Sequence, residues 1–321
     1  EGFDQSSDGL RCHMHWADYT AQRLMERGNE QVSASGITPS GEFHIGHLRE
    51  ILSAEMIHRA CLDAGMSSKY IFIVDSMDPL RRVYDFLSPE YEEFIGCPLA
   101  FIPAPEEDGS PGNGAITYAD HFLSPFLDSL EQIGVRPEVI MNHETYEKGL
   151  FAEYIDSAIA NREEIRRIIQ QISGRELPHD WFPYNPMGSG GSMDGVTVTG
   201  YEKPYVIWRD SSGNEGKSDI RRANGKMPWR VDWAARWVIH GITCEPAGKD
   251  HGAAGGSYDT GIPICRLLGG NPPDKIVYEW IQLKGMGPMS SSSGLTIGPM
   301  EALSLVPPEI LRYVIARSKI N

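Results

Sequence analysis

Two histidines stand near the end of the stretch from Ser35 to His47, which reads S-G-I-T-P-S-G-E-F-H-I-G-H. A short apolar run precedes this stretch and a long amphipathic segment follows it, which predicts a strand, a tight loop and the first turn of a helix. The free N–H groups and positive end of a helix attract an anion. Because His44 and His47 are three residues apart, they share one face of that turn and can both donate hydrogen bonds to one phosphate group. Gly46 leaves room for a flat base close to the backbone.

A second stretch suited to phosphate lies late in the chain, at Met289 to Gly294 (M-S-S-S-S-G). It follows Lys275 to Leu283, an apolar segment of strand type. Hydroxyl and backbone N–H donors on a loop suit a transient triphosphate. Read alone, the serines are better explained as a flexible linker, but their occurrence together with the two histidines favours a nucleotide-binding site.

The spacing of apolar residues predicts strands that alternate with helices. We expect strands at 31–37, 69–74, 138–141, 242–247 and 275–283, and helices at 16–26, 45–64, 118–133, 146–172, 231–240, 258–268 and 311–317. Asp75 and Asp78 directly follow the second strand, at the edge where ligands collect in open α/β sheets. Residues 178–216 are rich in Gly, Ser and Pro with short β-type runs. The expected fold class is α/β, a Rossmann-type doubly wound parallel sheet with a small β-rich insertion.

The composition limits the kinds of protein to which this chain can belong. The chain has 321 residues, 40% of them hydrophobic, which permits a large core. Its net charge of −15 argues against non-specific nucleic-acid binding and against an anionic membrane surface, but leaves room for a local basic face. No apolar run reaches ~18 residues, so no membrane span is expected. The five scattered cysteines lack a C-x-x-C pair and the first residues do not form a signal peptide, so we expect a reduced, cytoplasmic protein with thiols in its core.

The two phosphate stretches resemble the signatures of class I aminoacyl-tRNA synthetases. His44-Ile45-Gly46-His47 is similar to the first signature, and 288–292 corresponds to the second, which usually reads Lys-Met-Ser-Lys-Ser. A broader resemblance, over roughly residues 15–320, is to the class I lysyl-tRNA synthetases of the archaeal and bacterial type. It is carried by H-W-A-D-Y near Trp16, S-G-I-T-P-S-G at Ser35, W-R-V-D-W-A-A-R-W at Trp229, E-P-A-G-K-D-H at Glu245, G-G-S-Y-D-T-G at Gly255 and P-P-E-I-L-R-Y-V-I-A-R at Pro307.

The resemblance implies a catalytic domain that activates L-lysine with ATP and transfers it to the acceptor end of tRNA(Lys). Catalytic donors to the phosphates would be His44, His47, Ser290 and Ser292. The ATP site would comprise Pro39, Ser40, His44, Gly46, His47, Met289, Ser290 and Ser291. Mg²⁺ would be held through the nucleotide phosphates.

The resemblance also implies a lysine pocket, formed by Gly36, Thr38, Trp229, Asp232, His251 and Tyr278. Aromatic faces attract an ammonium group, and a carboxylate supplies counter-charge. Two alternatives stay open. Trp229, Trp233 and Trp237 recur at helical spacing, which is also typical of core packing, and Asp232 is placed to pair with Arg236 four residues on.

A tRNA-binding face, if present, would use the one clearly basic stretch, with Arg221, Arg222, Lys226 and Arg230. The alternative is a solvated basic loop.

The chain departs from the family pattern in three places. The second signature has Pro288 and Ser293 where lysines are expected, with Lys284 upstream. Relatives bind zinc in the insertion through cysteines and histidines, whereas 187–191 and 210–213 contain neither, so no structural zinc is expected. We expect the first half of the catalytic domain at 13–177, the insertion at 178–219, the second half at 220–300 and the start of a helical stem at 301–321, with the C-terminal anticodon-binding domain absent.

These departures motivate alternatives. One is a weak or inactive paralogue that binds ATP or an aminoacyl-adenylate. Another is a nucleotidylyltransferase of the same superfamily, against which the W-R-V-D-W and G-K-D-H segments argue.

Overall fold

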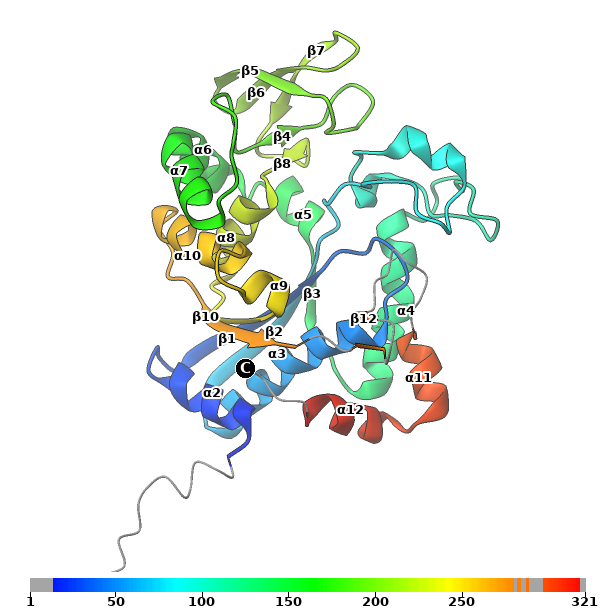
Figure 1. Cartoon of the computed structure of the whole chain (residues 1–321), viewed down its shortest axis with the longest axis vertical. Coiled ribbons are helices and arrows are strands. Elements are labelled where there is room, and N and C mark those ends of the chain that lie inside the picture. The colour runs from blue at the N-terminus through cyan, green and yellow to red at the C-terminus, as the bar shows by residue number, and fades with distance from the viewer. Residues whose placement is uncertain (1–13, 280–281, 284–286, 289–296, 318–321) are drawn as a thin grey trace, which may run out of the picture.

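The computed structural model describes residues 14–279, 282–283, 287–288 and 297–317. Its centre is a five-stranded parallel sheet (Figure 1). The strands are β1 (Glu30–Ile37), β2 (Ser67–Val74), β3 (Glu138–Met141), β9 (Cys244–Gly248) and β10 (Asp274–Tyr278). Their order across the sheet is β10-β9-β1-β2-β3. The expected α/β class with a doubly wound parallel sheet is confirmed.

Crossover helices join neighbouring strands. α3 (Ile45–Asp63) connects β1 to β2, α4 (Tyr118–Ile133) precedes β3, and α10 (Ser257–Leu267) connects β9 to β10. β1 and β9 are neighbours in the sheet. From β1 the chain continues to β2 and β3 on one side, and from β9 it continues to β10 on the other side. In open α/β sheets, ligands bind beside the carboxyl ends of the strands at such a switch point. The site is expected between the ends of β1 and β9.

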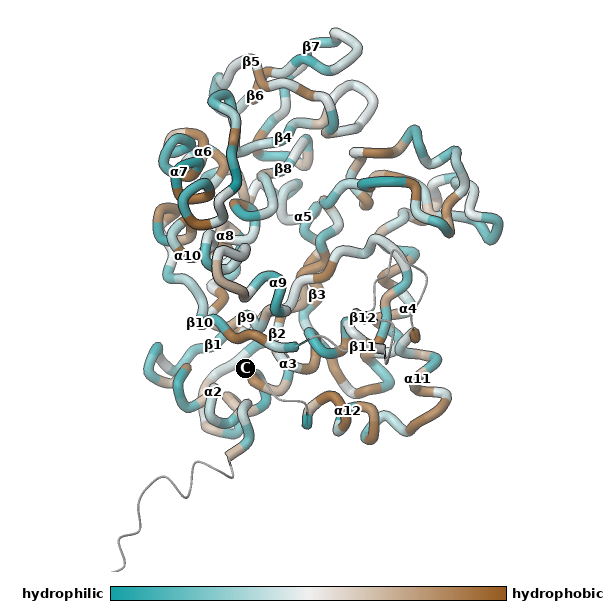
Figure 2. Tube along the Cα trace, viewed as in Figure 1, coloured by the Kyte–Doolittle hydropathy of each residue, from teal (hydrophilic) through white to brown (hydrophobic). Residues whose placement is uncertain are grey.

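Helices cover both faces of the sheet. Successive side chains of a strand point to opposite faces, and the apolar residues of β2 therefore need a packing partner on each face. Ile71 and Ile73 of β2 pack in a core with α6 (Ala152–Ala160), α7 (Arg162–Ser173), α8 (Trp229–His240) and α10. Phe72 and Val74 pack on the other side with α3, α4, α11 (Pro299–Leu305) and α12 (Pro308–Ala316). Helix α2 (Trp16–Met25) closes a smaller cluster against α3. Figure 2 shows hydrophobic stretches along the central sheet and on α6, α7 and α12.

The β-rich part lies at one end of the long axis of the molecule, away from the central sheet (Figure 1). Its three antiparallel strands are β5 (Thr197–Glu202), β6 (Tyr205–Arg209) and β7 (Glu215–Asp219). A short pair, β4 (Asn185–Pro186) and β8 (Gly225–Lys226), lies between it and the helices. Other short elements are α9 (Lys249–Gly252), 3-10 turns at Pro89–Phe94 and Leu99–Phe101, and the pair β11 (Gln282–Leu283) and β12 (Gly287–Pro288). The division of the chain into four segments stays a prediction.

Most expected elements are confirmed to within a few residues, among them 31–37, 118–133 and 138–141. The single helix expected at 146–172 is wrong: the chain forms α5 (Asn142–Glu147), α6 and α7. Gly149 explains the first break, because its φ of +75° lies in the left-handed region that stops a helix. The strand expected at 275–283 is also wrong in length, since β10 ends at Tyr278.

The four described cysteines, Cys61, Cys97, Cys244 and Cys265, are free and buried, as expected of small core residues. Among the residues that the structure describes, no helix combines the length and the apolar character needed to cross a membrane.

The packing of Phe126 generates a stability prediction. Its ring is 2% exposed and lies 4.5 Å from the Phe43 ring and 6.0 Å from the Phe72 ring, centroid to centroid. Phe126→Ala should lower the free energy of unfolding by about 3–5 kcal/mol, because it leaves a cavity beside the helix that carries the two histidines. Urea denaturation measures this. Leu305→Ala, at a side chain 76% exposed, is the control, and equal losses for the two variants would contradict the described packing.

Candidate functional site

The helix that carries the two histidines begins at the switch point. His44 is the residue that caps α3, and its ring stacks on the ring of His47 with centroids 3.8 Å apart. The backbone N–H of His44 donates to Nδ1 of His47 at 3.0 Å, so in neutral His47 the proton is on Nε2. Burial lowers the pKa of His44 to about 4. Burial, and then the nearby His44, lowers the pKa of His47 well below its usual value. At neutral pH both rings therefore offer N–H donors without positive charge.

Contacts with distant parts of the chain fix this helix start. A Cβ on Gly46 would lie 2.6 Å from Nδ1 of His44, so glycine is needed here for the His44 ring itself. The N–H of Ile45 donates to the carbonyl of Ile297 at 2.9 Å, which ties α3 to the chain just after the serine-rich stretch. In the loop before α3, Pro39 is buried and the carbonyl of Ser40 accepts from the Tyr118 hydroxyl at 2.5 Å.

The serine-rich stretch itself lies outside the described residues. The roles expected for Met289, Ser290, Ser291 and Ser292 therefore stay predictions.

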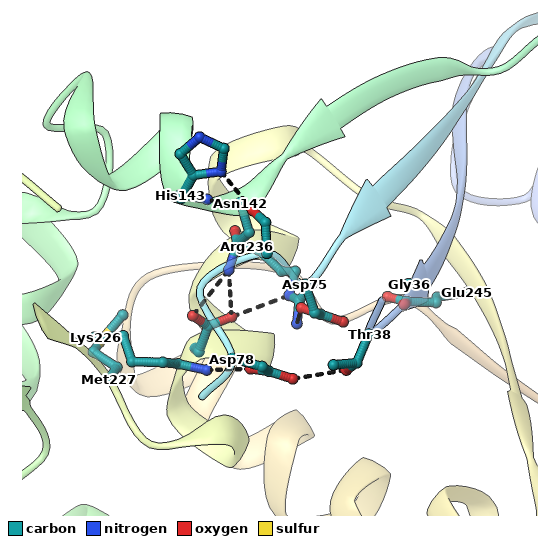
Figure 3. Close-up of polar contacts among 12 residues, drawn as sticks. Gly36, Thr38, Asp75, Asp78, Asn142, His143, Lys226, Met227, Arg236 and Glu245 are labelled. Carbon is teal, nitrogen blue, oxygen red and sulfur yellow. Dashed lines mark hydrogen bonds and ion pairs between the residues drawn. The ribbon is translucent and has the colours of Figure 1, made fainter. Parts of the chain in front are cut away.

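A buried network of charges follows the end of β2 (Figure 3). The guanidinium of Arg236 in α8 lies 2.7 Å from Asp75 and 3.2 Å from Asp232. All three side chains are at most 3% exposed. Burial raises the pKa of Asp75 to about 7, although the neighbouring Arg236 favours its ionised form. The network joins the end of β2 to α8 across the site.

Asp232 is held entirely by protein groups. It accepts a hydrogen bond from the Tyr146 hydroxyl at 2.5 Å and from the amide of Asn142 at 3.2 Å, in addition to facing Arg236. Its side chain is fully buried. This geometry favours the structural alternative for Asp232 over direct contact with a ligand.

Lys226 lies inside the site and not on a basic surface. Its ammonium donates to Asp78 at 2.7 Å, and the Thr38 hydroxyl donates to the other oxygen of Asp78 at 2.7 Å (Figure 3). Lys226 is 5% exposed. Because its ammonium group is buried against Asp78, the structure does not support the expectation that Lys226 belongs to a tRNA-binding face. The sequence could not show this contact, because the two residues are 148 positions apart.

The other three cations of the basic stretch are also partnered. Arg221 pairs with Asp219 at 3.0 Å, Arg222 pairs with Glu147 at 3.1 Å, and Arg230 donates to the Thr260 hydroxyl at 2.7 Å. They do not form one free positive face. Their contact with tRNA stays a prediction.

Sequence reasoning missed Glu50. It lies in α3 one turn after Gly46, and its Oε1 accepts from the N–H of Gly36 at 3.1 Å. Burial is the main cause that raises the Glu50 pKa to about 8, and the nearby Glu245 adds to it. A hydrogen bond with Tyr278 opposes the shift. The available signal was a charged residue one helical turn after the first signature, on the face that the histidines share.

Aromatic rings border the same space. Trp229 stacks on Trp233 with centroids 5.3 Å apart, and the His251 ring lies 6.0 Å from Trp229. The Arg236 guanidinium lies 4.9 Å above the Trp229 ring. Trp229 is the first residue of α8 and is only partly buried, so part of its surface stays accessible while it packs on Trp233. Farther in, the indole N–H of Trp237 donates to Glu245 at 2.6 Å.

The site therefore has the electrostatics of a cation pocket. Five carboxyl groups and two fixed cations meet here: Asp75, Asp78, Asp232, Glu50, Glu245, Lys226 and Arg236. Burial raises the pKa of Glu50, Asp75 and Glu245, and an ammonium ligand favours the ionised form of such carboxyl groups and is attracted to the Trp229 ring. Within the described ranges, no group of three or more His, Cys, Asp or Glu side chains is arranged to hold a metal ion.

Comparison with known proteins gives a consistent result. The family model described as tRNA synthetases class I (K) matches residues 14–321. A lysine--tRNA ligase of Archaeoglobus fulgidus is 45% identical over 308 residues, which cover 95% of this chain and 61% of that protein. Lysine--tRNA ligase 1 of Methanosarcina acetivorans is 43% identical over 310 residues, 95% of this chain and 57% of that protein. The chain thus spans about three fifths of the length of these relatives.

The burial of Lys226 generates a prediction. Lys226→Met should lower the free energy of unfolding by about 3–5 kcal/mol, because it leaves the Asp78 carboxylate, which is only 16% exposed, without its cation. Adding Asp78→Asn should recover part of the loss, since the amide carries no charge. Chemical denaturation of both variants measures this. Arg221→Met, at an exposed ion pair, is the control, and a loss for Lys226→Met no larger than the control's would place Lys226 outside the network.

Proposed function

Since the chain belongs to the tRNA synthetases class I (K) family, we propose that it activates L-lysine with ATP and transfers the lysyl group to the acceptor end of tRNA(Lys). The relatives named lysine--tRNA ligase support this assignment, with 43–45% identity over 95% of the chain. The reaction belongs to translation in the cytoplasm.

The observation that carries the choice of lysine is the pairing of Glu50 with Tyr278 beside Gly36. Transfer of a carboxylate into a protein interior is unfavourable unless an opposite charge accompanies it. The ε-ammonium of lysine supplies that charge and accepts no hydrogen bonds, so it pairs with the Glu50 carboxylate and the Tyr278 oxygen. Trp229 and His251 flank the aliphatic part of the substrate, and Gly36 and Thr38 border it on the strand side.

The chemistry needs two displacement steps. A carboxylate oxygen of lysine attacks the α-phosphorus of ATP. The new O–P bond forms as the bond to the bridging oxygen breaks, and pyrophosphate leaves with the electron pair. A terminal ribose hydroxyl of the tRNA then attacks the lysyl carbonyl, and AMP leaves. His44 and His47 donate their neutral N–H groups to α-phosphate oxygens, where charge rearranges in the transition state. The protein contributes by positioning the reactants.

When bound, Mg²⁺ would be held through the nucleotide phosphates and would neutralise part of their charge. The described carboxylates nearest the ends of β1 and β2, Asp75 and Asp78, already face Arg236 and Lys226. That arrangement fits a metal ion held through the phosphates.

The proposal predicts an amino-acid specificity. ATP–pyrophosphate exchange, run with and without tRNA, should depend on lysine and on no other amino acid. His44→Ala should lower the exchange rate by about 10²-fold or more, because a donor to the α-phosphate is lost. Exchange supported by glutamate or glutamine in place of lysine would contradict the assignment.

The raised pKa of Glu50 predicts proton release on binding. With a pKa of about 8, Glu50 in the free site is mostly protonated at pH 7, and an adjacent ammonium favours the carboxylate. Lysine binding at pH 7 should therefore release about one proton, and the affinity should rise about tenfold per pH unit between pH 6 and 8. Calorimetry in two buffers of different ionisation enthalpy measures the release.

Glu50→Gln is the matched variant, because it keeps the shape and removes the titrating group. It should release no proton and show little dependence on pH. A wild-type protein that binds lysine with no proton release would overturn this role of Glu50.

A further inference from the structure

Helix α12 reaches the edge of the proposed lysine pocket through one buried arginine. Arg49 precedes Glu50 in α3 and is only 1% exposed. Its Nη1 donates to the carbonyl of Ile315 at 2.8 Å. Ile315 is in the last turn of α12, where unpaired carbonyls and the negative end of the helix dipole attract a cation. The guanidinium is thus anchored by α12.

The same guanidinium faces Tyr278. Its central carbon lies 5.8 Å from the centroid of the Tyr278 ring, within the range of a cation–π contact. The hydroxyl of that tyrosine hydrogen-bonds to Glu50. Tyr278 is therefore held at its ring by Arg49 and at its hydroxyl by Glu50, and both arginine and glutamate come from consecutive positions of α3.

We propose that Arg49 is a positioning residue for amino-acid recognition: anchored by the last turn of α12, it orients Tyr278 toward Glu50. This inference rests on the proposed lysine pocket. A helix outside the pocket, α12, then sets the orientation of Tyr278 inside it, because Arg49 can orient Tyr278 only if Arg49 is itself held in place.

A second charged contact between the same helices supplies a control. Glu55 of α3 is 4% exposed and pairs with Arg312 of α12. It docks the same helix but lies farther along α3, where it forms ion pairs with Arg59 and Arg312. Glu55→Gln therefore removes one ion pair between α3 and α12 and leaves both contacts of Arg49 in place, with the Ile315 carbonyl and with the Tyr278 ring.

The experiment is a calorimetric titration of the 321-residue chain with lysine and, separately, with ATP. Arg49→Met should raise the Kd for lysine about tenfold or more and change the Kd for ATP less than twofold. Arg49→Lys should fall between, because it keeps a cation but not the planar guanidinium. Glu55→Gln should lower the melting temperature but change the Kd for lysine less than twofold.

A double-mutant cycle then asks whether Arg49 acts through Tyr278. Tyr278→Phe keeps the ring and removes the hydroxyl. If Arg49 works by orienting that hydroxyl, Arg49→Met added to Tyr278→Phe should weaken lysine binding less than twofold further. Two results would overturn the inference. One is a Kd for lysine of the double variant that rises by the product of the two single-variant factors, and the other is an equal rise in this Kd for Arg49→Met and Glu55→Gln. A wild-type chain that binds no lysine would instead refute the proposed function, so the two failures are distinguishable.

Discussion

The structure depends on one buried guanidinium. Arg236 reaches from α8 to Asp75 at the end of β2 and to Asp232 in its own helix, with no exposed surface on the arginine or on Asp232. Because each charge in such a group is costly to bury alone, removing any member leaves the others unpaired. The network therefore fixes where α8 lies relative to the end of β2. That placement brings Trp229, at the start of the same helix, and the Arg236 cation beneath it to the site.

The second half of the site follows from α3. Its first turn carries His44 and His47, its second carries Glu50, and its buried side packs on β1 and β2. In the proposed function, one helix thus bears donors for a phosphate and a carboxylate for an ammonium, separated by a single turn. The spacing between these two groups is set by helix geometry, which is more rigid than a loop.

Much of the fold was predictable, because β2 is a compact apolar run, α4 has apolar residues at helical spacing, and Gly65 and Gly134 mark the ends of α3 and α4. The helix at 146–172 was not, since its breaks depend on the left-handed conformation of Gly149 and on a turn at Asn161. Within the site, the motifs predicted roles for His44, His47 and the strand-side residues, and the structure places His44 and His47 together at the start of α3. Glu50 was missed because a glutamate in an amphipathic helix normally faces solvent. Lys226 was misplaced because its partner, Asp78, is distant in sequence.

We propose that Glu50 and Tyr278 recognise the side-chain ammonium of lysine. A crystal structure of the chain with bound lysine would test this directly. We expect the ε-nitrogen within hydrogen-bond distance, about 3 Å, of both the Glu50 carboxylate and the Tyr278 hydroxyl, with Trp229 along the aliphatic chain. A lysine bound in the reverse direction, with its ε-nitrogen beside Asp75 and Asp78 and nothing charged at Glu50, would contradict it.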